Sequence, residues 1–216
     1  MKILNMLVPM TIEGLKVTLG VFLVTLVFAI PLAVVVALLR RSNNRAISGV
    51  TATYIYIMRG TPLLLQLMFI FFGFHFVPVI GYAFSRFQAI YIAFILNYTA
   101  YFAEIFRGGI NSIDLGQYEA AKVLGMSKPF TFIKVILPQV IKNVLPAIGN
   151  EVITLVKDTS LVYILGASDI LKAAKSVSNV YSAFSPYVMI ALVYLAIVAV
   201  LTKLLSNIER RYNYYR

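Results

Sequence analysis

A long stretch without a charged side chain near the start of the sequence limits what this chain can fold into. Residues 17–39 are 23 consecutive uncharged and mostly apolar residues. A bilayer core is about 30 Å thick and needs roughly 20 apolar residues of helix, whereas the apolar region of a cleaved signal peptide runs to about 15. The stretch therefore predicts a membrane span that the protein retains.

The composition of the whole chain agrees with a membrane protein. Of its 216 residues, 61% are hydrophobic and 12% are charged, which is outside the range of a soluble globular domain. The net charge of +11 comes from basic residues that fall mainly between apolar runs, and no nucleic-acid motif accompanies them. With no cysteine and one histidine, we expect no metal site in the chain. We therefore predict an all-α membrane protein without a nucleic-acid partner.

Five helical spans are expected in a single transmembrane domain, because the apolar runs are joined by loops too short for a second domain. Thr61 and Pro62 predict the start of the second helix, with threonine as its cap and proline in its first turn. The fourth run is interrupted by three charged residues, so hydropathy alone leaves it in doubt. The spans are expected at about 14–39, 61–79, 86–106, 141–164 and 181–205, with a polar loop at about 107–139.

The distribution of basic residues predicts the orientation of the chain. Eleven Lys and Arg residues fall in the loops of one side and four in those of the other. The positive-inside rule then places the N-terminus outside and the C-terminus in the cytoplasm. Opposite sides for the two termini require an odd number of spans, which supports the fourth.

The polar loop contains the stretch GQYEAAKVLGMSKPFTFIKVILPQ, residues 116–139. Residues 119–124 suit a short helix, Gly125 allows a left-handed turn after it, and Pro129 can open a second helix. We expect a short helix, a turn and a helix outside the membrane. An amphipathic helix that rests on lipid headgroups is the alternative on physical grounds alone.

This loop resembles that of the permease subunits of ATP-binding-cassette (ABC) importers. Their cytoplasmic loop has the form EAA, three residues, G, nine residues, I, one residue, LP. Here valine stands in the isoleucine position, and the pattern falls on Glu119, Ala120, Ala121, Gly125, Val135, Leu137 and Pro138. RGTP at 59–62, EIFRGGINSI at 104–113 and KDTSL at 157–161 resemble the polar amino-acid branch, which includes importers of histidine, glutamine, glutamate, arginine and opines. The resemblance covers nearly the whole chain and implies the type I importer fold.

The resemblance also implies a set of partners in a prokaryotic inner membrane. An extracytoplasmic amino-acid-binding protein would deliver the cargo, and a dimer of cytoplasmic ATPase subunits would drive a pair of permeases, for which a homodimer is favoured. The short helix would dock on the ATPase. The chain has no G-x-x-x-x-G-K-[ST] sequence, so we expect it to hold no cofactor and no catalytic residue, and the ATPase to bind ATP and Mg²⁺. The coupling residues would be Glu119, Ala120, Ala121 and Gly125.

The stretch EVITLVKDTS, residues 151–160, brings charge into the fourth span. Helical residues seven apart differ by about 20° in direction and by about 10.5 Å along the axis, so Glu151 and Asp158 share a narrow stripe with Thr154. Lys157 points about 100° away from this stripe. A charged residue at the centre of a span costs roughly 2.5–3.5 kcal/mol, so it normally faces a bundle interior or a wet cavity.

Two interpretations of these acids compete. In one, Lys157 or another base pairs with the acids and locks helices together. In the other, Glu151, Asp158 and Thr154 line the translocation path and bind a cationic group of the cargo. Two acids about 10 Å apart suit an ammonium and a second cation, which points to arginine, lysine or histidine as a hypothesis. The sequence KDTS, however, resembles a sequence shared by members of this branch that carry different cargo, so Asp158 alone does not identify the cargo.

Other polar residues and other functions remain open. Asn97 in the third span either binds a cargo carboxylate or makes an interhelical hydrogen bond. Glu104 and Arg107 are expected to form a local ion pair. The alternatives to an ABC permease are a stand-alone channel or secondary transporter, which would work without ATP, and a membrane scaffold subunit, in which the acids would be dispensable.

Overall fold

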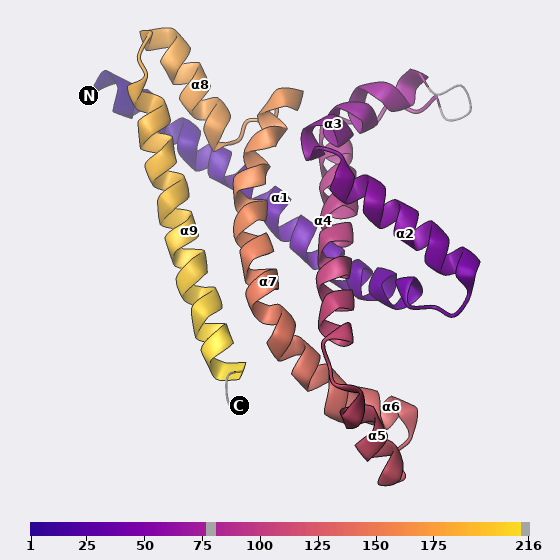
Figure 1. Ribbon diagram of the computed structural model, residues 1–216. Helices are drawn as coiled ribbons and strands as arrows, with labels where there is room; N and C mark the ends of the chain where they lie inside the picture. The colour runs from indigo at the N-terminus through magenta and orange to yellow at the C-terminus, as the bar shows by residue number, and fades with distance from the viewer. Residues whose placement is uncertain (77–80, 213–216) are drawn as a thin grey trace.

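The computed structural model describes residues 1–76 and 81–212, and within these ranges every regular element is helical. The expected all-α class is confirmed. Short π-helical and 3-10 turns extend α3 through Phe76, join α6 to α7 at Phe132–Ile136 and extend α7 through Leu165. The helices in Figure 1 are α1 (Lys2–Arg40), α2 (Arg45–Gly60), α3 (Leu63–Met68), α4 (Arg86–Asn111), α5 (Leu115–Val123), α6 (Lys128–Thr131), α7 (Leu137–Asp158), α8 (Ile170–Tyr181) and α9 (Ser185–Tyr212).

Four helical stretches in the described part of the chain are long and apolar enough to cross a membrane, and a bent pair makes a fifth. The four are α1, α4, the run Lys128–Leu165 that contains α7, and α9. A helix long and apolar enough to be the fourth expected span is therefore present despite its charges. The bent pair joins α2 to the helix at Leu63–Gly73 at an angle of 105°.

The helix expected at about 61–79 is found at 63–76 as α3 and its extensions, and residues 77–79 lie outside the described residues. The helix α2 before it and the bend between the two were not expected. A residue before proline is driven out of helical conformation, and Thr61 has the extended angles φ −120° and ψ 144°. Thr61 does not cap α3, because its hydroxyl donates a hydrogen bond back to the Ile57 carbonyl at 2.8 Å. Pro62 occupies the capping position instead. The proline thus ends α2 and redirects the chain into α3.

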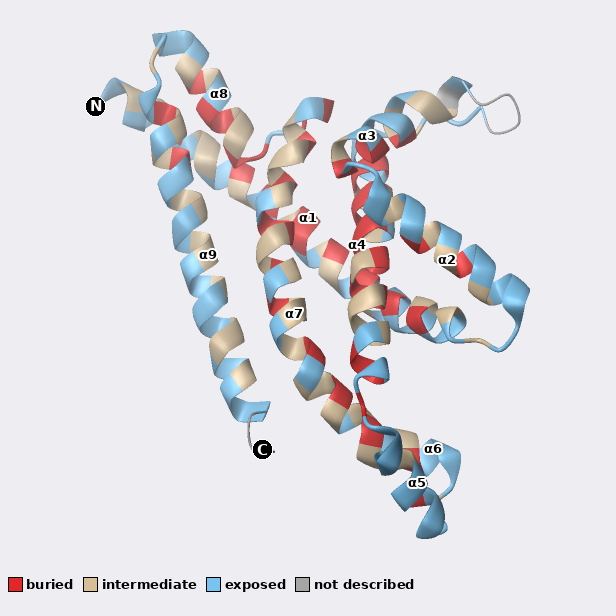
Figure 2. Cartoon of the chain, in the orientation of Figure 1, coloured by how far each residue is buried: buried red, intermediate tan, exposed pale blue. Residues whose placement is uncertain are grey.

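The core of the bundle lies between α1 and α4, which cross with α1 behind α4 in Figure 1. Small side chains recur at every fourth position of α1, at Thr25, Ala29, Ala33 and Ala37, and all are buried. Small residues allow two helix backbones to approach closely in a membrane protein. Figure 2 shows that buried residues concentrate on α4 and on the side of α1 that faces it.

The fifth span, expected at about 181–205, corresponds to α9, and α8 precedes it as a separate helix. α8 ends at Tyr181, its capping residue Ser182 has a left-handed conformation with φ 47°, and α9 begins at Ser185. The α8 side chains Ile170, Ala174 and Val177 pack in one cluster with α1 and α9. α8 and the N-terminus lie at one end of the molecule, whereas α5 and α6 project from the opposite end (Figure 1).

Candidate functional site

The two acids of the expected stripe lie on α7 in different surroundings. Both are partly buried, and Asp158 is the last residue of the helix. The hydroxyl of Tyr98 on α4 donates a hydrogen bond to Oδ2 of Asp158 at 2.8 Å. Tyr98 itself is 1% exposed, with its ring stacked on that of Phe94. Asp158 is therefore held in place by a buried donor on the neighbouring helix.

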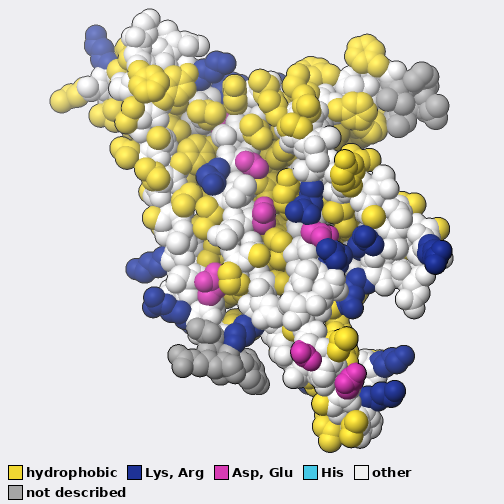
Figure 3. Space-filling view, in the orientation of Figure 1, with side chains coloured by type: hydrophobic (Ala, Val, Ile, Leu, Met, Phe, Trp, Pro, Cys, Tyr) yellow, Lys and Arg dark blue, Asp and Glu magenta, His cyan; other side chains and the backbone are white. Residues whose placement is uncertain are grey.

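Glu151 has no such partner. Its carboxylate makes no hydrogen bond and no ion pair with any residue in the described part of the chain. Thr154, on the same stripe, donates its hydroxyl to the Asn150 carbonyl at 3.0 Å, which is a bond within its own helix. Figure 3 shows acidic side chains at the surface over the region of α7 and α4. The stripe thus presents one free carboxylate and one that is held.

The basic residue of this segment does not neutralise the acids. Lys157 is exposed, and the ion pairs found among residues 1–76 and 81–212 are Glu13–Lys16 and Glu104–Arg107. The predicted Glu104–Arg107 pair is confirmed. Neither Glu151 nor Asp158 forms an ion pair within the described residues, although the charge of Arg59 acts on Glu151 and that of Lys157 on Asp158 at longer range. The lack of a direct ion pair favours the interpretation in which the stripe serves the translocation path.

Asn97 lies away from the stripe, at the bend between α2 and α3. Pro62 has no N–H to donate to the carbonyl four residues earlier, which is that of Met58. The Asn97 amide donates to this Met58 carbonyl at 3.0 Å and to Oε1 of Gln66 at 3.1 Å. Gln66 donates to the same carbonyl at 3.0 Å and to the Thr61 hydroxyl at 2.8 Å. These contacts favour the interhelical interpretation of Asn97.

Two residues that make these hydrogen bonds were not expected from the sequence. They are Tyr98, which contacts Asp158, and Gln66, at the bend between α2 and α3. Both carry polar groups inside apolar segments, and such groups are normally hydrogen-bonded when buried. That rule indicates that each has a partner, but the partner of Tyr98 lies 60 residues away along the chain. Spacing along a helix predicts only neighbours within a few turns, so it could not identify this partner.

The polar loop has the expected form of a helix, a turn and a second helix. Asp114 caps α5 by accepting a hydrogen bond from the Gly116 amide at 2.6 Å. Gly125 has a left-handed conformation with φ 71°, and Pro129 lies in the first turn of α6. The predicted helix, turn and helix are therefore confirmed.

The tip of this loop exposes several positions of the EAA-and-glycine pattern together with large apolar side chains. Glu119, Ala120 and Gly125 are exposed, whereas Ala121 is 3% exposed and packs inward. The side chains of Leu115, Val123 and Leu124 are 74%, 86% and 72% exposed. An exposed apolar patch of this kind indicates a surface that interacts with another protein or with the membrane.

Comparison with known proteins agrees with this geometry. The family described as binding-protein-dependent transport system inner membrane components matches residues 29–214. The arginine transport system permease protein ArtQ of Bacillus subtilis is 36% identical over 94% of this chain and 93% of its own length. The putative glutamine transport system permease protein GlnP of Rickettsia bellii is 37% identical over 93% and 91%.

A solved structure is similar over the same extent. A chain from the crystal structure of an amino acid ABC transporter with histidines superimposes with a TM-score of 0.87 at 38% identity, over 94% of both chains. The apolar helices, the exposed loop and these relatives agree on one assignment. The chain belongs to the family of binding-protein-dependent transport system inner membrane components and is a membrane-embedded permease subunit of an amino-acid ABC importer.

Proposed function

We propose that this chain forms the translocation path of an ATP-driven importer for a polar amino acid, and that Glu151 binds a cationic group of the cargo. The observation that carries the proposal is the partnerless carboxylate of Glu151 on a membrane helix. A carboxylate in such surroundings is costly unless a cation or water reaches it. The relatives named for arginine and glutamine and the transporter crystallised with histidines support an amino acid as that cargo.

The two acids divide the work of recognition. One carboxylate oxygen of Asp158 accepts a hydrogen bond from Tyr98 and the other can bind cargo, whereas both oxygens of Glu151 are available. A single acid recognises the ammonium group that every α-amino acid carries. The second acid, about 10.5 Å further along the helix, suits the side-chain cation of arginine, lysine or histidine. A basic amino acid is therefore the cargo that uses both.

The chain works with partners in this proposal. The exposed tip of α5 docks on a cytoplasmic ATPase dimer, which binds ATP and Mg²⁺ and performs the hydrolysis, while the permease changes no covalent bond. A binding protein delivers the amino acid on the outer side. A second permease subunit, with a homodimer favoured, covers the face that carries Glu151. The N-terminus is outside and α5 is cytoplasmic, in agreement with their opposite ends in Figure 1.

The proposal is tested by amino-acid stimulation of ATP hydrolysis in the assembled complex, reconstituted with its binding protein. Glu151→Gln preserves shape and removes the charge. Because a hydrogen bond to a charged group contributes about 1.5–3 kcal/mol, we expect half-maximal stimulation by arginine to need roughly ten- to hundredfold more amino acid. Asp158→Asn is expected to shift the arginine response in the same direction and the glutamine response less.

The matched control is Glu13→Gln, which removes an exposed acid that pairs with Lys16 on α1. It should leave both responses unchanged. An unchanged arginine response in Glu151→Gln would refute the cargo role of this residue. Uptake by the purified subunit alone, without ATP, would instead favour a channel or secondary transporter, and acids that prove dispensable together with a loop that binds no ATPase would favour a scaffold.

A further inference from the structure

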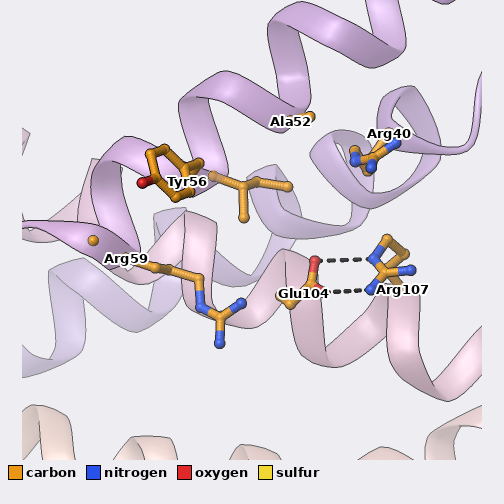
Figure 4. Close-up of a pocket in the computed structure, with 8 residues that line it drawn as sticks. Arg40, Ala52, Tyr56, Arg59, Glu104 and Arg107 are labelled. Carbon is orange, nitrogen blue, oxygen red and sulfur yellow. Dashed lines mark hydrogen bonds and ion pairs between the residues drawn. The ribbon is translucent and has the colours of Figure 1, made fainter.

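A polar cavity of about 400 Å³ lies between the end of α1, α2 and α4, and its lining does not include Glu151 or Asp158. Figure 4 shows its charged side chains, with Glu104 between Arg59 and Arg107 and with Arg40 near Arg107. The cavity is lined by Arg40, Ala52, Ile55, Tyr56, Arg59, Gly60, Glu104 and Arg107.

The charges of this cavity do not balance. Glu104 accepts hydrogen bonds from both Nε and Nη2 of Arg107, so these two residues neutralise each other. Arg40 donates from Nη1 to the Ser48 hydroxyl at 2.8 Å, a neutral partner. Three arginines against one glutamate leave two positive charges without a carboxylate in the lining.

Arg59 is the most available of the three guanidinium groups. It lies 5.3 Å from the centre of the Tyr101 ring, which orients it by a cation–π contact. Among residues 1–76 and 81–212 it makes no hydrogen bond and no ion pair. A guanidinium group carries five N–H donors in a planar fork that matches the oxygens of a phosphate group. Its donors therefore remain free for a ligand.

We propose that this cavity binds a phosphate group, supplied by an anionic lipid headgroup or by a soluble phosphate of the cytosol. Arg40 and Arg59, which form no ion pair with any described residue, match the one to two negative charges of a phosphate, and their forks give bidentate contacts. Arg40 ends a membrane helix and is followed by Arg41 and Arg45, which mark the level of the headgroups on the basic side. Basic pockets between membrane helices on that side are typical sites for phosphate-bearing headgroups.

The proposal uses only the cytoplasmic placement of this side from the proposed function, and it does not depend on the cargo. Its test therefore measures ligand binding without transport. The full chain is purified with its ATPase partner, and retention of phosphatidylglycerol relative to phosphatidylcholine is measured by native mass spectrometry. Arg59→Gln and Arg40→Gln are compared with Arg211→Gln, an exposed arginine near the end of α9.

We expect either cavity variant to lower the preference for phosphatidylglycerol about fivefold, since each arginine near a phosphate surface contributes about that factor. Arg211→Gln should behave as the wild type. Arg59 also contacts Tyr101, so Arg59→Gln could lose lipid binding by disturbing the fold. Arg40→Gln does not alter this contact and therefore tests the cavity independently.

A second arm distinguishes the two sources of phosphate. In micelles that contain no anionic lipid, inorganic phosphate is titrated against the thermal midpoint, with chloride as the matched salt. If phosphate raises the thermal midpoint of the wild type but not that of either cavity variant, the ligand is a soluble phosphate. If the protein prefers phosphatidylglycerol and phosphate does not raise the midpoint, the ligand is a lipid headgroup. If wild type, cavity variants and Arg211→Gln agree in both arms, the proposal is overturned.

Discussion

The contact between α4 and α7 and the exposed loop of α5 and α6 use apolar groups in opposite ways. Inside the bundle, the backbone of Gly109 meets Val144 so closely that an added Cβ would lie 2.1 Å from its Cγ1. At the loop tip, Val123 and Leu124 are 86% and 72% exposed. Buried apolar area contributes about 25 cal/mol per Å², so the first contact stabilises the fold, whereas the second surface leaves its apolar area available for the proposed contact with the ATPase. Substitutions should therefore separate stability from assembly.

The largest expected effect is on the contact inside the bundle. Gly109→Ala forces α4 and α7 apart, and overpacking of this kind costs typically 1–3 kcal/mol. We expect the thermal midpoint of the purified chain to fall by about 2–4 °C per kcal/mol. Gly108→Ala is the matched control, because a Cβ at Gly108 meets nothing within 4 Å. Equal midpoints for the two variants would show that the contact is not tight.

An effect of similar size is expected for the hydrogen bond that joins the same two helices. Tyr98→Phe leaves Oδ2 of Asp158 without its donor, which should cost about 1.5–3 kcal/mol for a bond to a charged acceptor. The double variant with Asp158→Asn should cost less than the sum of the single variants, because the two residues act as a pair. Chemical unfolding of all four proteins measures this coupling, and additive losses would show that the bond contributes nothing.

The smallest effect on the fold is expected at the loop tip. Val123→Ser should leave the thermal midpoint of the chain unchanged, because this side chain is 86% exposed. Burial of a valine at an interface contributes about 1.5 kcal/mol, so ATPase binding should weaken roughly tenfold. Val50→Ser, at a 73% exposed valine of α2, is the control. ATPase affinity that falls equally in both variants would remove the special role of the tip.

The order of these effects follows from what each region already contacts. Gly109 and Tyr98 have their partners within the chain, so substitutions there lower the stability of the subunit by itself. Val123 is largely exposed, so its substitution is expected to change the affinity for the ATPase and not the stability of the subunit. A single set of purified variants, measured for both thermal midpoint and ATPase affinity, compares the two regions directly.

Sequence alone determined the features that depend on neighbours within a few helical turns. The uncharged run at 17–39 and the balance of basic residues predicted the membrane class, and the spacing of Glu151 and Asp158 placed both acids on one stripe. Gly125 and Pro129 predicted the turn and the second helix of the loop, and the structure has both. These patterns are local because helix geometry repeats every few residues.

Only the tertiary structure decided which helix faces meet. It brought Tyr98 to Asp158, Asn97 to the carbonyl that Pro62 leaves free, and Arg40, Arg59 and Arg107 to one cavity. The structure also added the helix α2 and its 105° bend at Pro62, neither of which was expected from the sequence. Such pairings depend on crossing angles and on how side chains interlock between helices. Residues far apart in the sequence therefore become partners through packing, which local periodicity does not encode.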